Sequence, residues 1–327
     1  MLNKITIAKK LPALFAIMTT LSVVIVGLLS YLETSRAIQR DVFAKLKSVE
    51  QTIGKSMDTS FARIEADLNV IAGTSMTEDA FTRLGAGFEN IRREGKDPKE
   101  FLQNSYIRNN AYPESERHMA DSIDDGSYYS KFHGKYHDWF KTMLIEYGYH
   151  DIFLVSQKGD VVYSVFKERD FAENINSNAL RGSGLSVAVA KAASAEIGLT
   201  DFQPYVMSNG KLAAFIAREV KDQYDEAIGT LVLQLDPAPF KAIISDDAGF
   251  EGATRAFVLG ADGNVKFSHG VAENSPAASG DYFQNTDLLK SLSSGVSGVE
   301  IVTDSQTGQR LVAAYGLHPH HGVDMGL

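Results

Sequence analysis

The feature that most constrains this chain is an uninterrupted apolar run near its N-terminus. Residues 11–32, LPALFAIMTTLSVVIVGLLSYL, contain no Asp, Glu, Lys or Arg. A helix of that length rises about 33 Å, which is enough to cross the hydrocarbon core of a bilayer. Lys4, Lys9 and Lys10 precede the run, whereas Glu33 follows it. The positive-inside rule therefore predicts a cytoplasmic N-terminus and an exported remainder.

A cleaved signal peptide is the alternative interpretation of the same run. The apolar region of a signal peptide is about 7 to 15 residues long and precedes small residues of the A-x-A type. This run is longer, and no such site follows it. We therefore expect an uncleaved anchor in a bacterial inner (plasma) membrane, with residues 1–10 in the cytoplasm and the part after residue 33 in the periplasm or outside the cell.

Beyond the run, apolar residues recur at steps of three and four. They are Ile38, Val42, Leu46, Val49, Ile53, Met57, Phe61, Ile64, Leu68 and Ile71. This spacing lines one face of a helix, so the membrane helix is expected to continue outward as a long stalk. The stripe can pack against the chain's own domain, and its length also offers a surface to a second stalk. The pattern therefore favours a homodimer.

Residues 33–126 are expected to form this stalk and further helical stretches. Gly85, Gly87, Gly95 and Pro98 are predicted to break the helices there. An aromatic-rich helix should then cover about residues 126–146.

Strand-like segments begin at residue 151. Segments 151–157 and 161–166 flank a Lys-Gly-Asp turn, which predicts a hairpin. A helix at 185–193 and strands at 211–220 and 229–236 are expected next. This order is typical of a small antiparallel sheet with a helix across it, an α+β unit.

The same order recurs near the C-terminus. Strands are expected at 255–259, 264–268, 299–303 and 311–317, with a helix at 287–292. The sequence therefore predicts two α+β modules in tandem, at residues 127–240 and 241–327.

Several segments resemble the sensor regions of methyl-accepting chemotaxis proteins. They are Trp139-Phe140, residues 148–155 (GYHDIFLV), residues 158–171 (KGDVVYSVFKERDF) and Ser183-Gly184-Leu185. In those receptors the region is a double Cache domain, which consists of two PAS-like modules on a long stalk helix. The resemblance covers roughly residues 33–327.

This resemblance implies a dimer that binds a small molecule in a membrane-distal module at 127–240 and has a membrane-proximal module at 241–327. Similar sensors sit on histidine kinases and nucleotide cyclases, so the output stays open, and a non-sensory membrane-anchored protein is a further alternative. The closing residues 322–327 look like a last strand cut short. We therefore expect cytoplasmic signalling partners to act through a C-terminal region that this sequence lacks.

Amino-acid-binding Cache domains, which the chain resembles, carry Arg-x-Trp-Tyr on a helix, a following Tyr-x-Asp, and an Asp in the last strand. The corresponding places here read His137-Asp138-Trp139-Phe140, Tyr205-Val206-Met207 and Gln234. The aromatic frame is kept, whereas every charged anchor is replaced. Each missing charge-assisted hydrogen bond is worth about 1.5 to 3 kcal/mol, so a standard amino acid is not the expected ligand.

The resulting hypothesis is a pocket of six residues. Its aromatic lining would be Trp139, Phe140, Tyr163 and Tyr205, and its polar contacts His137 and Gln234. Such a pocket would take a less charged or organic-acid ligand. Aromatics at helical spacing also fit an ordinary core, so Gln234 is the stronger candidate because it interrupts an apolar strand.

Composition and motifs argue against several other functions. The formal charge of -9 disfavours nucleic acid, and the absence of cysteine removes thiol nucleophiles and Cys-based metal sites. The stretch Gly182-Ser-Gly-Leu-Ser lacks the spacing of a nucleophile elbow, and no glycine-rich phosphate loop with its Lys is present. We therefore expect no catalytic residues, no cofactor and no enzymatic activity.

Two histidine groups could in principle hold zinc. One is His133 with His137, four residues apart on the expected helix, and the other is His318, His320 and His321. The first pair lacks the Glu of a metalloprotease motif, and the second group surrounds a proline in an expected loop. Surface histidines and no metal site are the expectation.

Overall fold

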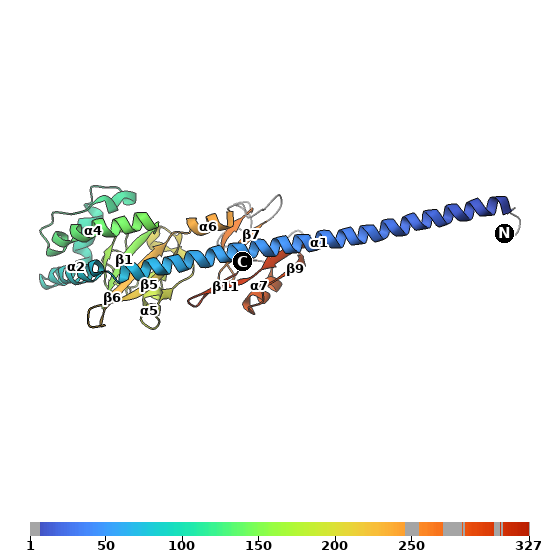
Figure 1. The fold of residues 1–327 in the computed structure, drawn as a ribbon. Coiled ribbons are helices and arrows are strands. Elements are labelled where there is room, and N and C mark those ends of the chain that lie inside the picture. The colour runs from blue at the N-terminus through green and yellow to red at the C-terminus, as the bar shows by residue number, and fades with distance from the viewer. Residues whose placement is uncertain are drawn as a thin grey trace.

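The computed structural model describes residues 7–245, 255–270, 283, 285–303, 308 and 310–326. A single helix, α1 (Ile7–Ala72), runs the whole length of the molecule, and two sheet-bearing modules lie along the part remote from the N-terminus (Figure 1). Every residue from 11 to 34 is exposed, and a window of this stretch has a mean hydropathy of 2.3. The single continuous helix predicted from the sequence over this region is confirmed, and its exposed apolar part is long enough to cross a membrane.

The apolar stripe of α1 is covered only in its outer half. Ile53, Met57, Phe61, Ile64, Leu68 and Ile71 are all buried. Nearer the membrane segment, Ile38 and Val42 remain 58 % and 40 % exposed. The modules of one chain therefore leave part of the stripe uncovered.

A set of short helices follows the stalk. They are α2 (Ser75–Arg93), α3 (Pro98–Gln103), a π turn (Asn104–Arg108), a 3-10 turn (Glu114–Met119) and α4 (Tyr128–Tyr147). The predicted breaks at Gly85 and Gly87 are wrong, because α2 runs through both. A Cβ on Gly87 would lie 2.7 Å from the Cα of Tyr129, so this glycine allows α2 to approach the backbone of α4.

The distal module contains a six-stranded sheet in the order β2-β1-β6-β5-β3, with β4 also paired to β5. The strands are β1 (Asp151–Ser156), β2 (Val161–Ser164), β3 (Gly198–Leu199), β4 (Gln203–Tyr205), β5 (Lys211–Lys221) and β6 (Ala227–Leu235). All pairs are antiparallel, as predicted.

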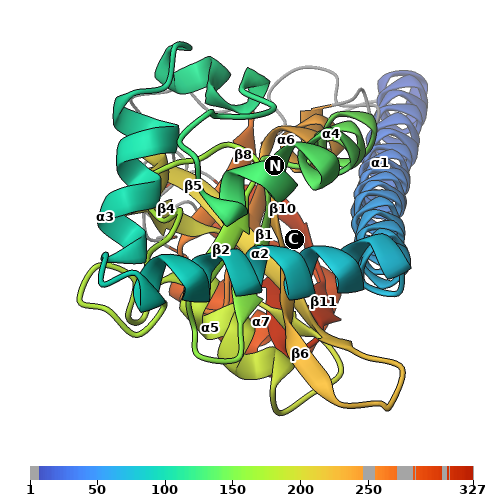
Figure 2. The same ribbon diagram turned by 90° about the vertical axis from the view of Figure 1, so that its left-hand side faces the viewer.

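Strand alternation divides this sheet into two faces. Ile152 and Leu154 join the core formed with α1, α2 and α4, whereas Phe153 and Val155 join the core under α5 (Gly184–Ala192). Figure 2 views the module end-on, with α2 and α4 in front of the strands and α5 below them. Any side chain on β1 or β6 therefore faces either the helices α1, α2 and α4 or helix α5.

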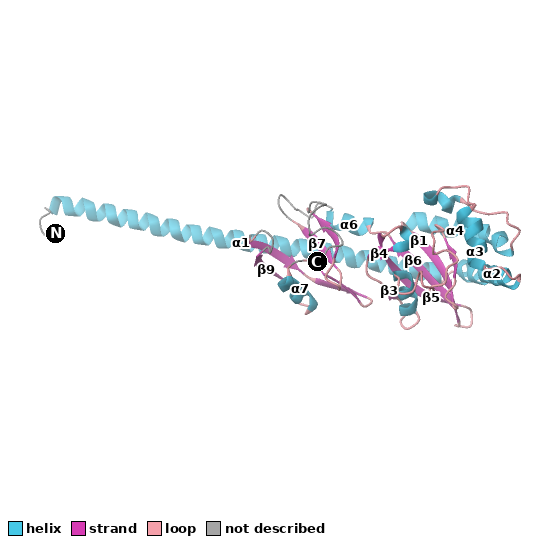
Figure 3. Ribbon diagram, turned by 180° about the vertical axis from the view of Figure 1, so that it is seen from behind, coloured by secondary structure: helices cyan, strands magenta, loops and turns pink. Residues whose placement is uncertain are grey.

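The proximal module lies closer to the membrane segment, as the view from behind shows (Figure 3). Its elements are α6 (Ala238–Ser245), β7 (Ala256–Leu259), β8 (Val265–His269), α7 (Thr286–Ser293), β9 (Gly298–Thr303), β10 (Arg310–Tyr315), β11 (Leu317–His320) and β12 (Val323–Gly326). The strand order is β11-β12-β7-β8, with β9 and β10 as a separate antiparallel pair.

Strand β11 and its pairing with β12 were not predicted, whereas β12 lies within residues 322–327, where a last strand was expected. The strand expected at 311–317 instead ends at Tyr315, and a second strand follows after Gly316. Proline is rare within sheets, so the sequence around Pro319 was interpreted as a loop. β11 is at the edge of its sheet, which is where a strand tolerates proline.

Candidate ligand-binding site

The six predicted pocket residues fall into two groups on opposite faces of the distal sheet. His137 and Phe140 from α4 meet Tyr163 of β2 in the core shared with the stalk, and Trp139 packs beside Phe140 with ring centres 4.8 Å apart. Tyr205 instead belongs to the core under α5. Gln234 shares its face, because it alternates with Leu233 and lies two residues from Val232.

The α4 group is a satisfied core cluster. His137 is fully buried, and its Nε2 lies 2.8 Å from the His118 carbonyl oxygen while its Nδ1 lies 2.7 Å from the Tyr163 hydroxyl. A carbonyl only accepts, so Nε2–H donates to it and Nδ1 accepts from Tyr163. Burial lowers the pKa of His137 to about 2, which keeps the ring neutral. Both ring nitrogens are therefore occupied within the protein.

The α5 group contains buried polar atoms that have no hydrogen-bond partner among the described residues. Tyr205 donates its hydroxyl hydrogen to Asp170 Oδ2 at 2.8 Å, and Gln234 Nε2 donates to Ser208 Oγ at 3.0 Å. Gln234 Oε1 and Asp170 Oδ1 are buried and accept no hydrogen bond from the described residues. Buried acceptors without partners are rare in proteins and indicate that another group belongs there.

Asp151 supplies a third such acceptor. It pairs with Gln234 across β1 and β6, so the two side chains are neighbours on one face. Its Oδ1 accepts from the backbone N–H groups of Ile152, Val165 and Phe166 at 2.7, 2.7 and 3.1 Å. Its Oδ2 has no donor within the described ranges. Three open acceptors thus come from Asp151, Asp170 and Gln234.

Burial dominates the electrostatics of this cluster. It raises the pKa of Asp151, and it raises the pKa of Asp170 well above the usual range, helped by the charges of Asp151 and Glu168. It also lowers the pKa of Lys167, whose ammonium lies 4.4 Å from the centre of the Tyr163 ring and donates to the Ser164 carbonyl. With its raised pKa, the Asp170 carboxyl holds a proton in the free protein. A positively charged or donor-rich group near the two carboxyls would offset the cost of their burial, displace that proton and leave the carboxylate oxygens as acceptors.

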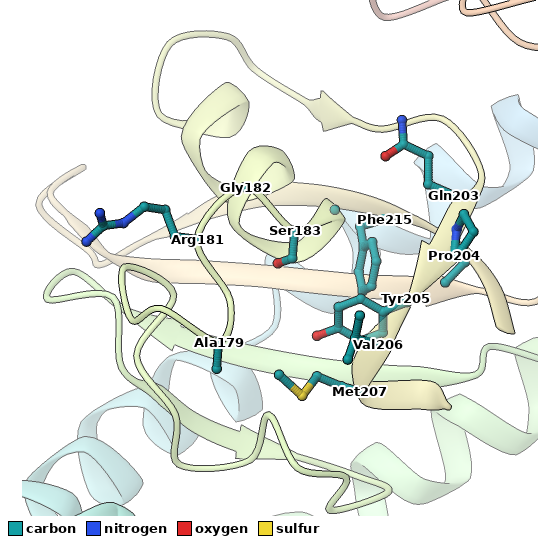
Figure 4. Close-up of a pocket in the computed structure, with 12 residues that line it drawn as sticks. Ala179, Arg181, Gly182, Ser183, Gln203, Pro204, Tyr205, Val206, Met207 and Phe215 are labelled. Carbon is teal, nitrogen blue, oxygen red and sulfur yellow. The ribbon is translucent and has the colours of Figure 1, made fainter. Parts of the chain in front are cut away.

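A cavity of about 250 Å³ lies on the α5 side of the distal sheet (Figure 4). It is lined by Ala179, Arg181, Gly182, Ser183, Gly184, Gln203, Pro204, Tyr205, Val206, Met207, Ala213 and Phe215. Tyr205 is both a wall of the cavity and the donor to Asp170, and Phe215 is the cross-strand partner of Gln234. The open acceptors therefore lie directly behind two lining residues. We call this space the distal cavity.

A second cavity of about 210 Å³ adjoins the first and reaches the proximal module. Both are lined by Gly182, Gly184 and Gln203, and the second also touches Ala261, Gly322 and Val323. Beside it, buried Lys266 forms ion pairs with Asp201 at 3.1 Å and Asp262 at 3.0 Å. The space that could hold a ligand thus continues to the contact between the two modules.

Most of the histidines considered for zinc are not surface residues, contrary to expectation, whereas His321 is exposed. His133 and His137 are fully buried with their rings stacked 4.6 Å apart, and His318 and His320 are partly covered by α1. Within the ranges that the structure describes, no three His, Asp or Glu side chains are arranged to hold a metal ion.

Sequence reasoning missed Asp151 and Asp170. The available signal was a carboxyl group directly before the apolar run Ile152-Phe-Leu-Val and another directly before Phe171. This signal is weak, because Asp is mostly exposed in proteins and is almost never fully buried unless it is paired.

No protein-family model matches the sequence, and no curated protein matches it either. Solved structures of similar fold are periplasmic and extracellular sensor domains of receptors. The Vibrio cholerae histidine kinase DctB sensor domain is 11 % identical, with 90 % of this chain and 97 % of that chain covered and a TM-score of 0.47. The periplasmic sensory domain of the Campylobacter jejuni chemoreceptor Tlp1 is 12 % identical, with 88 % and 94 % covered and a TM-score of 0.47.

An extracellular ligand-binding receptor from Desulfohalobium retbaense is also similar, at 12 % identity and a TM-score of 0.48, with 86 % of this chain covered. This chain spans 39 % of the length of that one. The likeness to all three proteins is one of fold, and at these identities no ligand or residue role is carried over from them.

Proposed function

We propose that this chain is the anchor and extracytoplasmic sensing region of a transmembrane receptor for a small molecule, and that the receptor belongs to the methyl-accepting chemotaxis class. The observation that carries the proposal is the distal cavity, behind whose wall lie three buried oxygen atoms that have no hydrogen-bond partner among the described residues. The exposed apolar segment of α1 supports a single membrane span, and the lysines before it support a cytoplasmic N-terminus.

The open acceptors bear on the ligand. Asp151, Asp170 and Gln234 offer oxygen atoms, and Lys167, a cation that interacts with Asp151, already contacts aromatic rings and a carbonyl. These atoms favour a ligand that presents hydrogen-bond donors over an organic acid. The cavity is smaller than the about 300 to 1,000 Å³ of drug-sized sites, which favours a ligand with few heavy atoms.

Ligand binding can be tested by thermal shift on the full chain in detergent. A ligand at about 100 times its dissociation constant adds about 2.7 kcal/mol, or roughly 5 to 11 °C in Tm. The panel should contain amines, amides, sugars, purines, amino acids and organic acids. A stabilising donor-bearing compound supports the proposal, whereas no stabilisation by any compound contradicts it.

Two variants test whether the ligand binds beside Gln234. Gln234→Leu removes one open acceptor and fills the same space, so it should fold and lose most of the ligand-induced shift. Trp139→Phe changes an aromatic on the opposite face of the sheet and should keep the shift. If both variants respond like the wild type, the ligand binds elsewhere.

We further propose that the receptor is a homodimer paired through the inner stalk. Ile38 and Val42 are exposed on the stripe whose outer part is buried. Because the chain has no cysteine, Val42→Cys provides a clean test. It should form a disulfide-linked dimer in membranes under mild oxidation, whereas Arg40→Cys, which projects from another side of the helix, should not. Equal crosslinking of the two variants would contradict this pairing.

A further inference from the structure

Three histidines of the proximal module face the stalk helix. They are His318 and His320 of β11 and His321 of the following turn, and we call them the histidine row. Their contacts are His318 Nε2 with Glu50 at 3.3 Å, His318 Nδ1 with Asp58 at 3.5 Å, His320 Nε2 with Asp58 at 3.1 Å, and His321 Nε2 with Glu65 at 3.0 Å. Every carboxylate comes from α1, so the row joins two separate parts of the molecule.

Two glycines make room for this contact. A Cβ on Gly54 of α1 would lie 2.0 Å from Cε1 of His318, and a Cβ on Gly316 would lie 2.1 Å from Oε1 of Glu50. Any other residue at either position would have to displace the imidazole or the carboxylate. The stalk therefore carries a notch at Gly54 in which the His318 ring is seated.

The members of the row have different surroundings. His318 and Glu50 are both mostly covered, whereas Asp58, His321 and Glu65 are each more than a third exposed. His320 packs its ring 4.4 Å from that of Phe61, in the core shared with Phe240. The His318 to Glu50 pair is therefore the one least screened by water.

The other charged groups nearby do not oppose this pair. On β12, Asp324 lies opposite Pro319, so it points away from the face that carries His318 and His320. Lys241 of α6 and Arg310 of β10 are exposed. Among the described residues, the groups that face the two rings from α1 are carboxylates, and the remaining ones are the histidines themselves.

We propose that the histidine row is a second sensory input, for protons, which fastens the β11–β12 hairpin to the stalk helix when the imidazoles are charged. An imidazolium bonded to a carboxylate forms a stronger hydrogen bond than a neutral ring. Acidification therefore fastens the hairpin to α1, and alkalinisation loosens it. None of the three histidines lines the distal cavity, although the adjoining second cavity touches Gly322 and Val323 of the same hairpin.

The direction of the pH dependence follows from the pKa of His318. Its pKa is raised, first by the hydrogen bond to Glu50 and then by the charge of Asp58, against the effect of burial. A group with a raised pKa stabilises the docked state fully below its ordinary pKa near 6.5, and this stabilisation is lost as the pH rises through the raised value. Burial lowers the pKa of His320, so that ring gains its proton only at lower pH.

Hydrogen exchange measured by mass spectrometry on the full chain in nanodiscs tests the proposal. After correction for the intrinsic exchange rate, protection of residues 317–326 should fall about two- to fivefold between pH 6 and pH 8, the range of a partly screened ion pair. His318→Gln keeps a polar side chain without a titratable charge and should remove this dependence. His269→Gln changes a histidine of β8, outside the row, and should retain it.

Gly54→Ala provides an independent check. It fills the notch and displaces the His318 ring, but it changes no titratable residue. We therefore expect it to lower hairpin protection at both pH values. Protection of β6 serves as the folding control for each variant, and Glu50→Gln replaces His318→Gln if that variant fails the control. The proposal is overturned if wild-type protection is independent of pH, or if His318→Gln, or Glu50→Gln in its place, keeps the wild-type dependence.

Discussion

The close contact between α2 and α4 predicts that replacing glycine by alanine has opposite effects on stability at Gly85 and at Gly87. Gly85 and Gly87 both lie inside α2, where alanine is favoured over glycine by about 1 kcal/mol. A Cβ at Gly85 meets nothing within 4 Å, so Gly85→Ala should stabilise the protein by up to that amount. A Cβ at Gly87 would lie 2.7 Å from Tyr129 Cα and 3.0 Å from its backbone nitrogen.

Those atoms of Tyr129 are backbone or next to it, so they cannot move without shifting α4. Overpacking of this kind costs about 1 to 3 kcal/mol, and here it also separates two packed helices. After the gain in helix propensity is subtracted, Gly87→Ala should destabilise the protein by up to about 2 kcal/mol. The two variants should therefore differ by about 1 to 3 kcal/mol.

Urea unfolding followed by tryptophan fluorescence measures this difference directly. The only tryptophan, Trp139, lies on α4 and packs against the distal core, so it reports on the helix that would be displaced. In a unit of about 200 residues, 1 kcal/mol corresponds to about 2 to 4 °C in Tm. If Gly87→Ala is as stable as Gly85→Ala, the backbones of α2 and α4 are not in contact and the reasoning fails.

Three further predictions concern buried polar groups. Tyr205→Phe removes the donor to Asp170 and should destabilise the distal module by about 1 to 3 kcal/mol. This loss would be measured as a lower midpoint of urea unfolding. An unchanged midpoint would contradict the hydrogen bond. Because burial raises the pKa of Asp170, the native state keeps a proton that the unfolded chain releases above its ordinary value of about 4, so stability should fall as the pH rises from there. Asp170→Asn should flatten that slope, and an unchanged slope would exclude this carboxyl as its source. Lys266→Met leaves Asp201 and Asp262 without their cation and should cost about 3 to 5 kcal/mol in calorimetry, whereas wild-type stability would show that the ion pair contributes nothing.

Local pattern was enough to predict much of the fold. The apolar run and the stripe after it predicted α1, and the Lys-Gly-Asp turn between two apolar segments predicted the hairpin of β1 and β2. Both features depend only on residues that are close together in the chain. The helix breaks at Gly85 and Gly87 were wrong because glycine serves there for contact between helices, which depends on a partner about 40 residues away.

The site was harder to predict for a related reason. Alternation along β6 correctly singled out Gln234 as a polar side chain on a buried strand. It could not say that α4 covers one face of the sheet and α5 the other, so His137 and Tyr205 were assigned to one pocket although the sheet separates them. Asp151 and Asp170 were overlooked because their burial results from the packing of β1 against β6 and of Tyr205 against the loop after β2.

The unbroken course of α1 has a mechanical consequence. Its 66 residues form a rod of about 99 Å at about 1.5 Å per residue. If the rod pivots at its outer end, near Ala72, a tilt of about 1° moves the opposite end by about 1.7 Å over that length. A lever of this kind converts a rearrangement in the modules that is smaller than a single bond length into a larger displacement at the N-terminal end of the helix, about half the distance between two touching carbon atoms.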